Sequence, residues 1–286
     1  MSAPETAPGP ASEFEGGPGR GSEHGNGFEA GSDVEDEGGF EDEAAPVAAT
    51  GMRARMREEL TRQIVATARR HLVTEGAAGL SLRAVARELG MVSSAVYRYV
   101  ANRDELLTLL IVDAYDALGE AVERAEAKVP RDDYEDRYLA ACEAARRWAL
   151  ESPHEFALIY GSPVPGYAAP ETTVGPASRL GQVLIGVLYD ALASGALDPA
   201  AVDLPVAARR ALAPAREFLP PEIPDGLAFG ALTLWTHLVG TISFELFGHR
   251  NNVVADTPTL RAAFFTEEMT QLARRFGLVP EPLPPD

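Results

Sequence analysis

The sequence predicts an all-α protein, in which an acidic tail precedes two helical domains. Three observations predict this fold class. From about residue 53 onward, apolar residues recur every three or four positions, which is the spacing of one face of a helix. No segment shows the sustained apolar–polar alternation typical of a half-buried strand. Glycine and proline fall where the periodic segments end, and 286 residues are enough for a sizeable core.

The distribution of charge sets the first boundary. Residues 1–50 carry twelve acidic side chains and one basic one, Arg20, among many Gly, Pro, Ser and Ala residues. Such a segment buries too little apolar surface to offset its ordering entropy, so we expect residues 1–50 to form a disordered acidic tail. From Gly51 to Arg103, ten arginines stand against four glutamates, although the whole chain has a net charge of -18. The acidic average therefore conceals a basic module.

Residues 51–101 predict a domain of three helices. The first is expected from about Arg53 to Thr74, before a stop at Gly76, with apolar residues spaced by four: Leu60, Ile64, Ala68 and Leu72. Ser81 is expected to cap the second helix, which ends at Gly90 and has an inner face made of Leu82, Val85, Ala86 and Leu89. The third helix begins near Val92 or Ser93, and its expected inner face is Val92, Val96 and Val100.

Residues 102–279 predict a larger helical domain. Asn102 is expected to cap a long helix that reaches Lys128, with Glu105 completing a variant of the capping box and Pro130 ending the helix. Further helices are expected at about 132–150, 153–160, 177–194, 225–247 and 257–276. Between them lie a Pro/Gly loop, "GSPVPGYAAPETTVGP", and a proline-punctuated segment over residues 199–224. Residues 280–286 are expected to form a loose end.

The second and third helices, joined by a tight turn at Gly90, have the layout of a helix-turn-helix. Burial of the valines leaves four polar side chains on the opposite face: Ser93, Ser94, Tyr97 and Arg98. Hydroxyls at a helix start can donate to phosphates or base edges, and arginine can reach guanine or phosphate. The local arginines are what a DNA reader needs to neutralise phosphates. The competing interpretation is a helical hairpin with a solvated face.

The stretch "LSLRAVARELGMVSSAVYRYVANRDELL" resembles the DNA-binding domain of TetR-family transcriptional regulators. The match covers about Arg53 to Asp113, in the order and spacing of its motifs. The resemblance implies that Ser81 and Arg83 meet phosphate or a base, and that Ser93, Ser94 and Tyr97 face the major groove. It also implies that Tyr99 and Arg103 lie beside the DNA backbone. Val92 departs from the pattern, because Ser or Thr often caps the recognition helix there; either Ser93 caps it, or the helix starts less sharply.

The stretch "LWTHLVGTISFELFGH" is similar to a Trp-His-Gly pattern found in one subgroup of TetR C-terminal domains. Aromatic and histidine side chains in this half are candidates for an effector site between the fifth helix, the short helix before the Pro/Gly loop and the Trp-His-Gly helix: Trp148, Phe156, Tyr160, Trp235 and His237. The same side chains would serve equally well as core. The run from Gly226 to Phe244 approaches the length of a membrane span, but the polar residues within it favour a helix covered by its own domain and by a partner subunit.

Other site classes lack a signal in the sequence. Catalytic motifs, metal-ligand spacing among the histidines and a phosphate-binding loop are absent, so we expect no enzyme activity, no metal and no cofactor. The lone cysteine, Cys142, is expected to pack in the core of a cytoplasmic protein.

These observations predict a homodimeric repressor that binds a palindromic site on double-stranded DNA and responds to an unknown small-molecule effector. Two alternatives are an architectural DNA binder without an effector and an enzyme with an appended DNA-binding head. The acidic tail is interpreted as a solubilising extension, as a competitor of DNA, or as the result of a translation start upstream of Met52, which opens "MRARMREEL".

Overall fold

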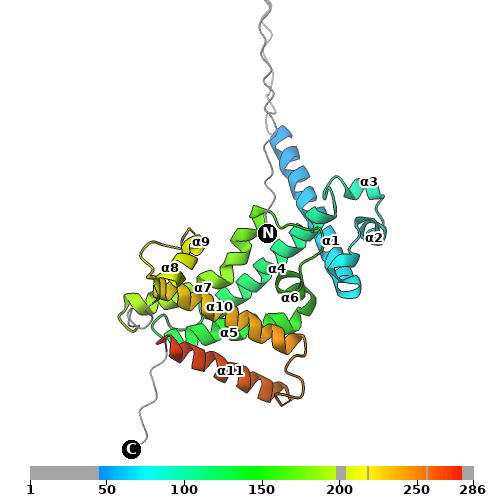
Figure 1. Ribbon diagram of the computed structural model, residues 1–286. Helices are drawn as coiled ribbons and strands as arrows, with labels where there is room; N and C mark the ends of the chain where they lie inside the picture. The colour runs from blue at the N-terminus through cyan, green and yellow to red at the C-terminus, as the bar shows by residue number, and fades with distance from the viewer. Residues whose placement is uncertain (1–44, 198–203, 218, 256, 279–286) are drawn as a thin grey trace, which may run out of the picture. The chain divides into compact units, whose positions relative to one another are not determined.

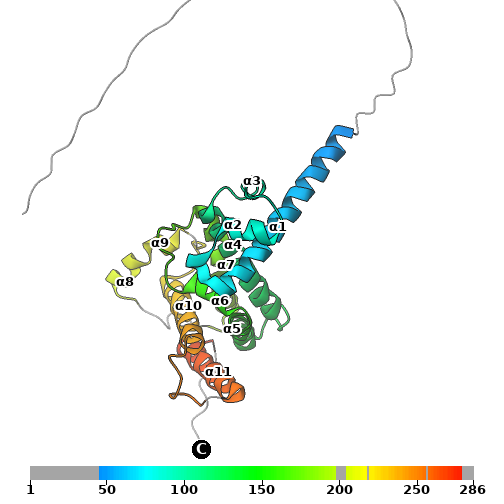
Figure 2. The same cartoon turned by 90° about the vertical axis from the view of Figure 1, so that its right-hand side faces the viewer.

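The computed structural model describes residues 45–197, 204–217, 219–255 and 257–278, and within these ranges it is helical without a strand (Figures 1 and 2). The amino-terminal part contains α1 (Ala45–Gly79), α2 (Leu82–Glu88), α3 (Ser93–Val96) and the long α4 (Arg103–Glu126). The expected all-α class is confirmed. The expected tail over residues 1–44 and the loose end over residues 280–286 lie outside the described residues, whereas residues 45–50 are helical backbone.

The remaining helices pack against one another and, in part, against α4. They are α5 (Tyr134–Glu151), α6 (Pro153–Tyr160), the short 3-10 helix η1 (Glu171–Thr173), α7 (Val174–Ala193), α8 (Val206–Ala211), α9 (Ala213–Arg216), α10 (Asp225–Leu246) and α11 (Pro258–Arg275). α4 packs against both α5 and α7, and α7 also packs against α10. Two short helices, α8 and α9, lie in the segment that the sequence marks only as proline-punctuated. Both views place α2 and α3 beside α1, remote from α11.

Helix ends follow local chemistry in some places and depart from it in others. Asn102 caps α4 as expected, since its side chain accepts from the Glu105 amide at 2.8 Å, while the Glu105 carboxylate accepts from the amide of Ala101 at 2.5 Å. The first helical segment of α1 ends at its expected stop, because Gly76 has a non-helical backbone with a φ of 67°, and a short second segment follows to Gly79. The expected side-chain cap from Ser81 is wrong, because its hydroxyl makes no capping hydrogen bond.

Buried apolar side chains form two clusters that meet within α4. The first, which we call the head core, runs from Ile64 to Leu110 and contains one face each of α1, α2, α3 and the start of α4. The second begins at Ala114 on α4 and includes side chains of α5, α6, α7, α10 and α11. A single helix therefore contributes to both cores, and the expected domain boundary after residue 101 stays a prediction.

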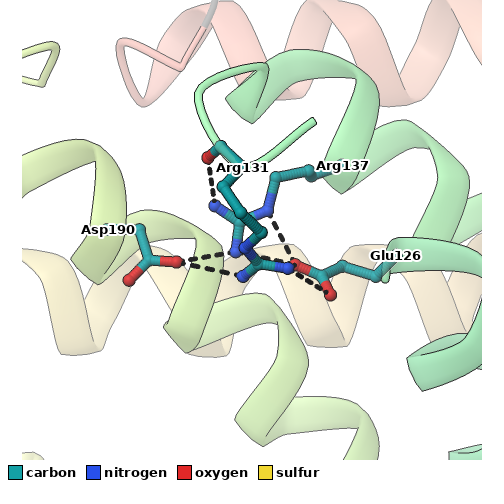
Figure 3. A network of polar contacts seen from close by, with 4 residues as sticks. All are labelled: Glu126, Arg131, Arg137 and Asp190. Atoms are coloured by element: carbon teal, nitrogen blue, oxygen red, sulfur yellow. Dashed lines mark hydrogen bonds and ion pairs between the residues drawn. The ribbon is translucent and has the colours of Figure 1, made fainter. Parts of the chain in front are cut away.

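A buried ion network fastens α4, α5 and α7 together (Figure 3). Arg137 on α5 is 1% exposed, and its guanidinium contacts Glu126 on α4 and Asp190 on α7, each at 2.7 Å. It also donates to the carbonyl of Arg131 at 2.9 Å, while the Arg131 side chain contacts the same two carboxylates. Because Glu126, Arg137 and Asp190 belong to three different helices, the network fixes how these helices meet in the second core.

Candidate DNA interface and effector cavity

The helix-turn-helix is built on apolar contacts and one glycine. Gly90 adopts a φ of 66°, and the following amide of Met91 bonds to the Ala86 carbonyl at 2.9 Å, which ends α2 and reverses the chain. Val96 and Val100 are fully buried in the head core, as the periodicity predicts. The third expected inner residue is wrong: Val92 is 71% exposed, because it precedes the first turn of α3 rather than lying on its inner face.

A polar face of α2 and α3 is turned to solvent. It carries four of the expected DNA-contacting side chains, all exposed: Arg83, Ser94, Tyr97 and Arg98. Arg87, one turn after Arg83, is exposed on the same helix and was not singled out by the sequence. Arg83, Arg87 and Arg98 form no ion pair with any described residue, unlike other arginines of this module. Their charges therefore remain available to phosphates.

Neither of the two hydroxyls expected at the helix starts, those of Ser81 and Ser93, caps its helix. Val92 is the residue before α3, so Ser93 lies inside the first turn and the alternative in which Ser93 caps the helix is wrong. Ser81 and Ser93 are half-buried, and neither hydroxyl makes a capping hydrogen bond. α3 itself is only four residues long and continues as a turn through Tyr99. The recognition segment thus starts less sharply than a capped helix would.

Tyr99 and Arg103 have intramolecular partners. The guanidinium of Arg57 lies 5.7 Å from the centre of the Tyr99 ring, which is half-buried against the head core. Arg103 donates to the carbonyls of Ala77 and Ala78 at 2.9 and 3.3 Å, and so ties the end of α1 to the start of α4. The structure thus gives both residues a role in holding the module together.

Two more arginines of the basic stretch hold the fold. Arg70 and His71 on α1 both contact Glu88 on α2, at 2.7 and 2.5 Å. The hydrogen bonds from Arg70 and then from His71 hold the pKa of the Glu88 carboxyl below its usual range. Arg69 pairs with Asp113 on α4 and with Glu155 on α6. Composition alone does not separate these paired arginines from those without an ion pair, because their carboxylate partners lie 18 or more residues away.

A cavity of about 910 Å³ opens in the second half of the chain, which is a size that suits a drug-like ligand. Its walls come from α4, α6, the loop before η1, α7, the end of α9 and α10. Most side chains that line the cavity are apolar or aromatic, and a few are neutral and polar. They include Ile111, Tyr115, Leu158, Val164, Tyr167, Ser178, Gln182, Ile185 and Trp235. No residue of α5 lines it, so the cavity lies away from the fifth helix, where the sequence suggested an effector site.

The five expected ligand residues are distributed between the cavity and the core. Trp235 lines the cavity, whereas Trp148 and Phe156 are buried in the second core. Tyr160 lies just behind the wall, with its ring 6.5 Å from that of Trp235 and 5.9 Å from that of Tyr115. His237 instead contacts Glu268 on α11 at 3.1 Å. Aromatic content indicated the region of this cavity but did not separate lining residues from core residues.

The sequence reasoning missed two tyrosines that line the cavity. Tyr115 on α4 donates from its hydroxyl to the Ile159 carbonyl at 3.3 Å, and Tyr167 of the Pro/Gly loop is 2.9 Å from the Thr108 hydroxyl. A tyrosine inside the loop "GSPVPGYAAP" was the available signal, because loops rich in Pro and Gly often border ligand sites. Within the described residues, no group of three or more His, Cys, Asp or Glu side chains is arranged to hold a metal ion.

α10 passes the length and composition test for a membrane span, with a mean hydropathy of 1.4. Several of its side chains nevertheless pack in the second core, including Leu234, Leu238 and Ile242. A core helix meets the same criteria, so this helix is weak evidence for a membrane location.

Comparisons with known proteins agree with this arrangement. Residues 64–110 match the model for bacterial regulatory proteins of the tetR family, and residues 138–272 match a tetracyclin repressor-like C-terminal domain. The HTH-type transcriptional regulator Rv1816 of Mycobacterium tuberculosis is 45% identical over 207 residues, which cover 69% of this chain and 85% of that protein. The regulator Mb1846 of Mycobacterium bovis matches to the same extent.

Solved structures show the same fold. The crystal structure of the protein SCO4313 is 31% identical, with a TM-score of 0.63 over 77% of this chain and 97% of that one. A Rhodococcus protein of unknown function, 22% identical, has a TM-score of 0.58 over 76% of this chain and 95% of that one. Since the two family models and the mycobacterial relatives span the helix-turn-helix and the helical C-terminal domain together, the chain belongs to the TetR family of DNA-binding transcriptional regulators.

Proposed function

We propose that this regulator is a homodimeric, cytoplasmic repressor, without enzyme activity, that leaves a palindromic operator when a small molecule enters the cavity. The observation that carries the proposal is a shared wall. Leu158, Val164 and Tyr167 line the cavity and also pack against the head core. A ligand that displaces these side chains therefore acts directly on the packing of the DNA-binding module. The cavity favours this function over that of an architectural binder without an effector.

Polar contacts reinforce the connection between cavity and head. Tyr167 in the cavity wall hydrogen-bonds to Thr108 on α4, while Arg69 on α1 pairs with Asp113 on α4 and with Glu155 on α6. A shift of α6 or of the Pro/Gly loop would pull on both α1 and α4. The effector can change operator affinity only by as much as it prefers one arrangement of these helices over the other.

The proposed DNA contacts are the exposed side chains of α2 and α3 and the residues that begin them. They comprise the expected Ser81, Arg83, Ser93, Ser94, Tyr97 and Arg98, to which we add Arg87 and Val92. The arginines would neutralise phosphates, and the Val92 side chain is suited to a thymine methyl group. In a dimer, two such faces would enter major grooves about 34–36 Å apart.

Dimerisation is proposed through α10 and α11, where large apolar side chains remain exposed. Phe229, Leu232, Phe244 and Phe247 follow one side of α10, and Leu260 and Phe264 are exposed on α11. A patch of this kind on a folded chain marks a protein–protein contact. Two copies related by a two-fold axis would cover each other's α10 and α11.

The test of this function is binding to the DNA that flanks the protein's own gene, measured by footprinting and fluorescence anisotropy. A protected palindrome is expected. Tyr97→Ala is expected to weaken operator binding by roughly tenfold or more, because a side chain that reads a base supplies about 1–3 kcal/mol. Tyr189→Ala is a matched control, because Tyr189 is also exposed but lies on α7. Operator affinity that is equal in both folded variants would refute the assignment of the DNA-binding face.

A second variant tests whether the cavity wall is coupled to the DNA-binding module. Tyr167→Phe removes only the hydroxyl that bonds to Thr108, so the ligand-free protein is expected to retain its operator affinity. The ligand-induced loss of that affinity is expected to shrink. An unchanged ligand response would show that this hydrogen bond takes no part in the coupling.

A further inference from the structure

We infer that the cavity takes an uncharged, largely apolar ligand with a hydrogen-bonding group at the end that meets Tyr115 and Trp235. This inference rests on the proposed function, since it names the chemical class of the effector. Across the described residues, the lining contains no Asp, Glu, Lys, Arg or His side chain. Its polar groups are all neutral, and they include Gln182, Ser178 and Thr173.

Several of these neutral groups already have partners. Ser178 donates to the Gly175 carbonyl at 2.8 Å and accepts from Gln182 at 2.9 Å, while Thr173 donates to the Pro170 carbonyl at 2.8 Å. They can hold a wall in shape, but none brings a full charge to the ligand.

Two arginines on the surrounding helices have their own carboxylate partners. Arg179 on α7 pairs with Glu123 and Asp116 of α4, each at 2.7 Å. Arg216 on α9 pairs with Asp225 at the start of α10. An ionised ligand would therefore lose water on entering the cavity without gaining a counter-charge, which disfavours it strongly against a neutral one of the same shape.

The polar end of the cavity is marked by an unsatisfied hydroxyl. The Tyr160 hydroxyl is buried and makes no hydrogen bond to a described residue. Its burial raises the pKa of Tyr160, and Tyr115 adds to the rise, while the Trp235 indole opposes it without reaching hydrogen-bond geometry. Tyr160 stays a neutral phenol at physiological pH. Because the rings of Tyr115 and Trp235 line the cavity and lie next to the Tyr160 ring, a movement of either ring would open this hydroxyl to a ligand.

The test compares two fluorescent molecules that share one scaffold. N-phenyl-1-naphthylamine is neutral. 8-anilino-1-naphthalenesulfonate has the same ring system, with a sulfonate on the naphthalene carbon peri to the amine. Both compounds are titrated into the full-length protein without DNA. The neutral compound is expected to bind with a Kd that is lower than that of the sulfonate by roughly tenfold or more. Equal or tighter binding of the sulfonate would overturn the inference, and so would the absence of binding by the neutral compound.

Variants show whether the cavity is the site. A Cβ on Gly181 or on Gly186 meets no atom within 4 Å, and both glycines lie on α7, but only Gly181 lines the cavity. Gly181→Leu is expected to lower the affinity for the neutral compound by roughly tenfold or more, because the leucine fills part of the cavity. Gly186→Leu is the matched control. Gln182→Arg adds a cation to the wall and should reduce the preference for the neutral compound. If both leucine variants bind it like the wild type, the site is elsewhere and the inference fails.

Operator binding, measured on the same preparations, separates the two conclusions. A protein that binds its operator but prefers the sulfonate would refute only the ligand class. A protein that prefers the neutral compound through Gly181 but binds no flanking DNA would refute only the proposed function.

Discussion

Replacing Arg137 by methionine is expected to lower the free energy of unfolding by about 3–5 kcal/mol. The arginine is buried, and its guanidinium holds Glu126 and Asp190 at 2.7 Å (Figure 3). Methionine fills a similar volume but removes the inner cation. The Glu126 side chain, 11% exposed, would then keep only Arg131 as a counter-charge. Asp190, 44% exposed, would be compensated by water, so most of the cost falls on Glu126.

Arg131→Met is the matched control, because it removes the other arginine of the same network. The Arg131 side chain is 61% exposed, so water replaces much of what its ion pairs supply, and the expected loss is about 1 kcal/mol or less. Thermal unfolding distinguishes the two variants. For a protein of this size, each kcal/mol lowers Tm by about 2–4 °C, which gives roughly 6–20 °C for Arg137→Met and under about 4 °C for Arg131→Met.

Adding Glu126→Gln to Arg137→Met removes the buried charge that the first substitution leaves behind. Part of the lost stability is expected to return, since the stranded carboxylate causes most of the loss. Equal losses of stability for Arg137→Met and Arg131→Met would refute the reasoning, because burial would then make no difference to the free energy of unfolding that an arginine contributes in this network. A further loss in the double variant would show that Glu126 contributes through something other than its charge.

The remaining predictions concern the dimer face, the cysteine and acid stability. Phe264→Glu is expected to give folded monomers in sedimentation, since Phe264 is 46% exposed, whereas Leu272→Glu is expected to unfold the chain because Leu272 is buried; a dimeric Phe264→Glu protein would move the interface elsewhere. Cys142 is expected to resist thiol reagents at pH 8 until denaturant is added, because burial raises its pKa to about 12; rapid labelling of the native protein would contradict this. Hydrogen bonding to Arg179 lowers the pKa of Glu123, so its stabilising contribution is present above the ordinary carboxyl pKa and is lost as pH falls through the lowered value. Glu123→Gln should therefore cost more stability at pH 7 than at pH 3 in urea titrations, and an equal cost at both pH values would contradict this.

The helix-turn-helix could be predicted because its determinants are local. Ile64, Ala68 and Leu72 are spaced by four, and all three are buried in the head core. Gly90 adopts the positive φ that its place between two periodic segments suggests. Val92 was misassigned because a spacing of four identifies a buried face only inside a helix, and α3 begins one residue later.

The dimer face could not be predicted from apolarity, because α10 and α11 are apolar on more than one side. Phe264 and Met269 are both large apolar residues of α11, yet Met269 is fully buried and only Phe264 is exposed. Gly230 of α10 allows a close approach within the chain, because a Cβ there would lie 3.1 Å from the Phe276 ring. Which neighbour a side chain meets is decided by tertiary packing.

The ion-pair partners of the arginines could not be predicted from the sequence either, because they too are decided by tertiary packing. Arg69 and Arg83 belong to one basic stretch, but Arg69 finds Asp113 and Glu155, 44 and 86 residues further on, whereas Arg83 finds no ion-pair partner among the described residues. The fold thus pairs some arginines of this stretch with distant carboxylates and leaves others, such as Arg83, without a counter-charge among the described residues. An acidic chain can in this way present a basic face to DNA, since phosphates respond to the charge within about 10 Å rather than to the sum over the molecule.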